Sequence, residues 1–77
     1  MLNEKLVEIV ALVFGVAENE VRPESSRETL GEWDSVGHLR LIAAVEEVFE
    51  IEFPITEIET LTSVATIQAA VDRLQPR

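Results

Sequence analysis

The side chains best suited to chemistry in this chain lie close together, at Asp34, Ser35 and His38. Residues three apart are neighbours on a helix, so the Ser35 hydroxyl and the His38 imidazole could face one another there. No acid that would orient the imidazole, no oxyanion donors and no pocket are evident in the sequence. We therefore interpret His38 as a surface histidine, or as one touching a phosphate, and not as a catalytic base. Ser35 is then either a helix-start residue beside a capping aspartate or a point where a group is attached.

The elements that position these residues are expected to be helices. Apolar residues recur at helical spacing in three long segments and one short one. The pattern predicts helices over residues of about 3–15, 35–50, 56–60 and 63–74, with a long loop over 16–34. No segment alternates with a period of two. The predicted fold class is all-α, a small bundle of three main helices plus a short third helix, in one domain over residues 1–77.

Polar residues at the expected helix starts support these positions. Asn3, Asp34 and Ser63 are typical N-cap residues, and Gly15 is a typical helix stop. A carboxylate at Asp34 would also meet the positive end of the following helix dipole. The long loop is expected to be anchored by its apolar residues, Val16, Val21 and Leu30.

The second long helix is expected to bury one apolar stripe. Its members are Val36, Leu39, Ile42, Ala43, Val45 and Phe49, widened by Leu41 and Val48. We interpret Trp33, just before this helix, as a structural anchor where the loop meets the bundle, in preference to a direct partner contact. Ile55, Ile58 and Leu61 suggest the short third helix.

The composition excludes several classes of function. Acidic residues outnumber basic ones by 15 to 6, giving a formal net charge of -9, which is opposite to the cationic footprint of a nucleic-acid binder. No stretch approaches the roughly 20 apolar residues that span a bilayer, and the first residues do not resemble a signal peptide. The chain has no cysteine, which is typical of a reducing compartment. We expect a cytoplasmic monomer without membrane insertion and without a metal site.

The chain resembles the acyl carrier protein family over nearly its whole length. The resemblance rests on Leu30-Gly31-Glu32-Trp33-Asp34-Ser35-Val36, on Leu39, Leu41 and Ile42, and on Val45-Glu46-Glu47-Val48-Phe49. It continues through Ile51, Phe53-Pro54, Val71 and Leu74. An Asp-Ser pair alone carries little information. The same pair after Leu-Gly and a long loop, opening a helix that ends in Glu-Glu-x-Phe, is a strong signal.

The resemblance implies that Ser35 carries 4′-phosphopantetheine, moved onto its hydroxyl from coenzyme A by a phosphopantetheinyl transferase. Asp34 would be the neighbour that the transferase recognises, near its magnesium ion. The carrier would hold acyl groups as thioesters on the thiol of that arm and would not itself be an enzyme. Phosphate at this position would also face the unpaired N–H groups of a helix start.

The resemblance further implies that the second helix docks onto basic patches of partner enzymes. These would be acyl-activating, acyltransferase or ketosynthase-type enzymes. The expected docking residues are Val36, Arg40, Glu46, Glu47 and Glu50, with Glu52 and Glu57 as further acidic candidates. The expected function is to present acyl intermediates to partner enzymes of fatty acid, polyketide or another specialised acyl pathway. Val36, Gly37 and Arg40 depart from the pattern of housekeeping fatty acid synthesis, which favours a stand-alone carrier of a specialised pathway.

Two alternatives stay open from the sequence. The first is an aminoacyl or peptidyl carrier, including the D-alanyl type, although Glu32-Trp33-Asp34 argues mildly against the peptidyl class. The second is an unmodified helical interaction module that uses its acidic face alone. That module would bind partners regardless of the Ser35 hydroxyl.

Overall fold

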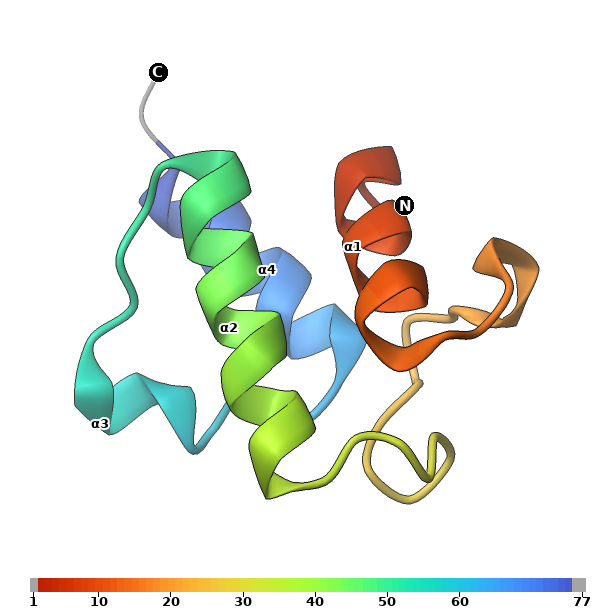
Figure 1. Cartoon of the computed structure of the whole chain (residues 1–77). Helices are drawn as coiled ribbons and strands as arrows, with labels where there is room; N and C mark the ends of the chain where they lie inside the picture. The colour runs from red at the N-terminus through yellow and green to blue at the C-terminus, as the bar shows by residue number, and fades with distance from the viewer. Residues whose placement is uncertain (1, 76–77) are drawn as a thin grey trace.

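The computed structural model describes residues 2–75, in which the regular elements are helices (Figure 1). In chain order they are α1 (Glu4–Phe14), the single 3₁₀ turn η1 (Glu18–Glu20), α2 (Ser35–Phe49), α3 (Ile55–Ile58) and α4 (Val64–Leu74). The predicted all-α fold class is confirmed, and η1 lies within the long segment that the sequence left as loop.

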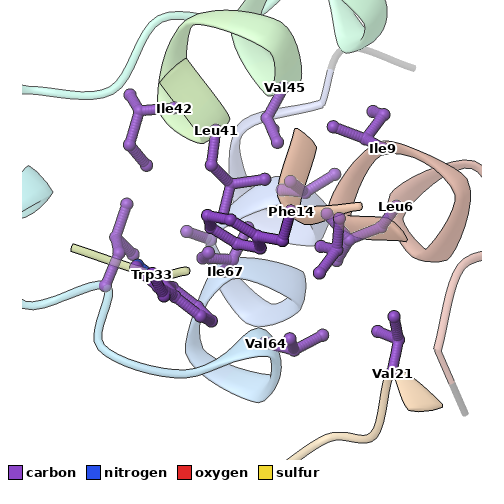
Figure 2. Close-up of a cluster of buried hydrophobic side chains, with 14 of the residues drawn as sticks. Leu6, Ile9, Phe14, Val21, Trp33, Leu41, Ile42, Val45, Val64 and Ile67 are labelled. Atoms are coloured by element: carbon purple, nitrogen blue, oxygen red, sulfur yellow. The ribbon is translucent and has the colours of Figure 1, made fainter. Parts of the chain in front are cut away.

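The core lies where α1, α2 and α4 meet, and the short α3 flanks α2 on the side away from α1 (Figure 1). Figure 2 shows the aromatic ring of Phe14 among aliphatic side chains from all three long helices. The largest fully buried side chains are Trp33, Leu6, Leu41, Ile67, Val10, Val45, Val64 and Val71. One residue of the long loop, Trp33, therefore contributes its ring to the helical core.

Local chemistry defines the ends of the helices. The Asn3 side chain accepts hydrogen bonds from the first turn of α1, and Gly15 ends that helix with φ of 66°, a left-handed conformation that glycine adopts without steric cost. The Ser63 hydroxyl accepts from the Thr66 N–H at 3.2 Å and caps α4. The short α3 begins directly after Pro54, whose fixed φ is compatible with a helix start.

The long connection between α1 and α2 is attached to the start of α4. Val21 and Leu30 are buried and Val16 is half-buried, as expected of anchors. In addition, Ser25 accepts a backbone hydrogen bond from Val64 at 3.0 Å, and Pro23 accepts one from Ala65 at 2.9 Å. These bonds could not be predicted from periodicity, and they join residues 23–25 of the connection to the first turn of α4.

The predicted apolar stripe of α2 is wrong in part. Val36, Leu39 and Val48 are 57%, 62% and 46% exposed, and Ala43 is exposed as well. The side of α2 that faces the core instead consists of Gly37, His38, Leu41, Ile42, Val45 and Phe49. The prediction merged two sides of the helix because it left out His38, whose burial sets the register. Ile55, one of the three apolar residues that suggested the short third helix, is 85% exposed.

Candidate functional site

Ser35 is the first residue of α2 and its side chain is exposed. Asp34 precedes it in an extended conformation and caps the helix, as predicted, because its Oδ1 accepts the Gly37 N–H at 2.7 Å. The Asp34 carbonyl oxygen also accepts the His38 N–H at 2.8 Å. The serine hydroxyl is thus held at the tip of a rigid helix and is open to a large molecule.

The two serine-bearing helix starts differ in the free N–H groups that they offer. At α4, the N–H groups of Val64 and Ala65 are taken by the loop carbonyls of Ser25 and Pro23. At α2, within residues 2–75, no protein acceptor takes the N–H groups of Ser35 and Val36. Unpaired N–H groups at a helix start favour a phosphate, so the start of α2 is the one suited to an anion.

Trp33 holds the loop against the bundle immediately before this helix start. It is 1% exposed, and its ring stacks on Phe14 at a centroid distance of 5.3 Å and an interplanar angle of 25° (Figure 2). Its Nε1–H donates to Nδ1 of His38 at 2.9 Å. Trp33 is therefore the structural anchor that the sequence favoured.

His38 is not the surface histidine that we expected. It is 7% exposed and its ring lies in the interior, with Nδ1 accepting from Trp33 and Nε2 2.9 Å from the carbonyl oxygen of Ile58. The physical reason is that a buried indole N–H needs an acceptor and the imidazole supplies one. Neither a catalytic role beside Ser35 nor a contact with an attached phosphate fits this geometry.

Gly37 is a site residue whose function the sequence did not reveal. A Cβ at this position would lie 2.6 Å from the carbonyl oxygen of Glu32 and 2.9 Å from Cε1 of Phe14. The absence of a side chain therefore lets the loop before Ser35 pass directly against α2. The only available signal was a glycine inside a predicted helix, where glycine costs about 1 kcal/mol relative to alanine.

The expected docking residues do not form one uniform surface. Val36, Arg40, Glu47 and Glu50 are exposed, and Arg40 lines a cavity of about 400 Å³ together with Asp34 and Gly37. Glu46 is only half-exposed, and its carboxylate accepts the Phe53 N–H at 2.8 Å. Its carboxylate thus joins the end of α2 to the next segment, and the adjacent Glu46 and Glu47 differ in their surroundings.

The two further acidic candidates also differ from one another. Glu52 is exposed, whereas Glu57 is paired with Arg73 of α4. Within the described part of the chain, no three side chains of the metal-binding type come together, and no helix is long and apolar enough to cross a membrane.

Comparison with known proteins identifies the family. A family model described as a phosphopantetheine attachment site matches residues 4–71, which run from the first residue of α1 to the last turns of α4. The chain belongs to this phosphopantetheine-attachment family of carrier proteins. Its cofactor is 4′-phosphopantetheine, held covalently. An exposed hydroxyl beside free N–H groups at the start of α2 fits such a phosphate-linked arm.

A solved structure supports the carrier fold over most of the chain. The solution NMR structure of a holo acyl carrier protein from Geobacter metallireducens matches with a TM-score of 0.82 and 28% sequence identity. The match covers 92% of this chain and 82% of that protein. The resemblance to acyl carrier proteins is thereby confirmed at the level of family and fold.

Proposed function

We propose that this carrier bears its arm on Ser35 and delivers acyl groups, bound as thioesters, to partner enzymes. The observation that carries the assignment is the difference between the two helix starts. The Ser35 hydroxyl is exposed beside two N–H groups with no protein acceptor in residues 2–75, whereas the corresponding N–H groups of α4 are already paired. The arm supplies the thiol that forms the thioester, since the chain itself contains no cysteine.

The protein's part in attachment is to present the hydroxyl and to stabilise the phosphate. A phosphopantetheinyl transferase would supply the base that takes the Ser35 proton as the oxygen bonds to phosphorus. Asp34 would cap the helix start through its bond to the Gly37 N–H, and its exposed carboxylate would face the transferase and its magnesium ion. The chain would have no catalytic activity of its own.

We further propose that partners dock on the exposed side of α2. This surface, the α2 docking surface, consists of Val36, Leu39, Arg40, Glu47 and Glu50. It is apolar and cationic near Ser35 and anionic at the far end of the helix. Partners with a basic patch opposite Glu47 and Glu50 and an apolar surface near the thioester would complement it. Because of Arg40, we place the carrier in a specialised acyl pathway and not in housekeeping fatty acid synthesis.

The cargo can be tested with the thiol itself. Because the chain has no cysteine, any thiol titrated on the purified protein after incubation with coenzyme A and a transferase belongs to the arm. The thiol-bearing form is then offered to an acyl-activating enzyme and, separately, to an amino-acid-adenylating enzyme. Loading by the first supports an acyl carrier, and exclusive loading by the second supports the aminoacyl or peptidyl alternative. A cytoplasmic monomer is the state in which we expect it to act.

A further inference from the structure

His38 is bonded at both ring nitrogens, and its two partners determine where its proton lies. An indole N–H can only donate, so Nδ1, which lies 2.9 Å from Trp33 Nε1, carries no hydrogen. A carbonyl oxygen can only accept, so Nε2, which lies 2.9 Å from Ile58 O, carries the hydrogen. The geometry therefore requires the neutral ring with its proton on Nε2.

This imidazole joins three segments that the helices alone do not hold together. Trp33 ends the loop before the Asp34–Ser35 pair, His38 lies on α2, and Ile58 is the last residue of α3. A helix of four residues is too short to persist without tertiary contacts. The polar contacts of α3 with other elements are the bond from His38 to Ile58 and the ion pair between Glu57 and Arg73, whose side chains are partly exposed; the Ile58 side chain also packs against the core.

We propose that neutral His38 is a positioning residue for the attachment site. Its two hydrogen bonds form a clamp that fixes the Trp33 loop and α3 to α2, and protonation of the ring opens this clamp. A proton on Nδ1 would place two donors face to face, because the indole nitrogen has no lone pair to offer. The ring is 7% exposed, so the new positive charge would also be buried. The clash of donors and the buried charge would both weaken the contact between His38 and Trp33.

The charged groups around the ring do not compensate for that proton. His38 lines a cavity of about 350 Å³ together with Arg27 from the loop and Glu59 from the segment after α3. These two side chains bear opposite charges, so neither sign dominates. On the α2 side, the Asp34 carboxylate is already bonded to the Gly37 N–H, and from α3 Glu57 is paired with Arg73. Within residues 2–75, none of these groups forms a hydrogen bond or an ion pair with the imidazole.

The chain offers an unusually clean test, because it contains one histidine and one tryptophan. Imidazole nitrogen NMR on the full-length unmodified protein should show the Nε2-protonated ring at about pH 7.5. The sample is then acidified stepwise, and the same nitrogen resonances report directly when the ring takes up its second proton. Trp33 fluorescence and the indole N–H resonance should change with the same midpoint.

The mechanical consequence is read from backbone amide exchange in α3, corrected for the intrinsic pH dependence of exchange. We expect protection at residues of α3 to fall on the order of tenfold as the clamp opens, the effect of losing about one buried hydrogen bond. His38→Gln should abolish the fluorescence step. Trp33→Phe keeps a ring against Phe14 but has no N–H, so α3 in that variant should respond less to acid. The Trp33→Phe measurement stands even if His38→Gln fails to fold.

An Nδ1-protonated ring at neutral pH, or α3 protection that does not change as His38 titrates, would overturn the clamp. The link to attachment rests on the proposed function of Ser35 and is measured separately, with transferase kinetics at about pH 7.5. A raised KM of the transferase for His38→Gln with kcat retained supports the positioning role. If the wild type is modified and the KM for His38→Gln is unchanged, only the positioning role of His38 is contradicted. If the wild type is not modified at all, the assignment of Ser35 is contradicted.

Discussion

Gly37 of α2 lies directly against the backbone of Glu32, so that a Cβ on residue 37 would be 2.6 Å from the Glu32 carbonyl oxygen. This contact brings the last residues of the loop across the first turn of the helix. It explains how Trp33 reaches the core while Ser35, two residues later, remains exposed. The proposed attachment site is thus built on a close approach of two backbones.

Gly37→Ala should therefore destabilise the fold. Helix propensity alone favours alanine by about 1 kcal/mol. Overpacking against a backbone oxygen and the Phe14 ring should reverse that gain and lower the free energy of unfolding by about 1–3 kcal/mol. Urea unfolding measures the difference. Gly31→Ala is the matched control, because nothing lies within 4 Å of its added Cβ, and it should be neutral or slightly stabilising. Equal stability of the two variants would refute the packing role.

The two roles assigned to Asp34 can be separated by substitution. Asp34→Ala removes the cap on Gly37 and should lower the free energy of unfolding by about 1 kcal/mol. Asp34→Asn keeps an oxygen that accepts the same N–H, so its stability should stay near that of the wild type. If the carboxylate is what the transferase reads, both variants should be modified slowly. Full-rate modification of Asp34→Asn would show that the aspartate is only a cap.

Substitution of the neighbouring residues Glu46 and Glu47 should affect the free energy of unfolding differently. The Glu46 carboxylate accepts the Phe53 N–H in a half-buried position, so Glu46→Ala should cost about 1 kcal/mol of unfolding free energy. Glu47 is exposed and its side chain makes no hydrogen bond to another of the described residues, so Glu47→Ala should change the free energy of unfolding by less than about 0.5 kcal/mol. Thermal unfolding of the pair measures this, and equal losses would contradict it.

Modification by the transferase should be more sensitive to a charge reversal on the α2 docking surface than to one elsewhere on the chain. Glu47→Lys should lower kcat/KM of the transferase by about tenfold at low salt, because it places a cation opposite the partner's basic patch. Glu8→Lys makes the same change in net charge at an exposed position of α1. Its effect should be several times smaller. Comparable losses in both variants would mean that net charge, and not this surface, guides the encounter.

The helices and their caps were predictable because they depend on local sequence. The spacing of apolar residues locates α1, α2 and α4, and the side chains of Asn3, Asp34 and Ser63 mark where these helices begin. Such residues act on N–H groups within three positions of themselves, so no knowledge of the rest of the fold was needed.

The contacts that build the site were not predictable because they join distant segments. His38 was misplaced because its burial depends on the carbonyl of Ile58, 20 residues away. Glu46 could not be distinguished from Glu47 without the position of Phe53. A tryptophan five residues before a histidine was the one local hint, since a buried indole N–H requires an acceptor.

The assignment of Ser35 as the attachment residue is tested most directly by intact mass spectrometry. The protein is incubated with coenzyme A and a broad-specificity phosphopantetheinyl transferase, alongside Ser35→Ala and, as a control, Ser63→Ala at the other serine-bearing helix start. We predict a gain of one phosphopantetheine in the wild type and in Ser63→Ala, and none in Ser35→Ala. Modification that persists in Ser35→Ala, or a wild type that several transferases leave unmodified, would contradict it.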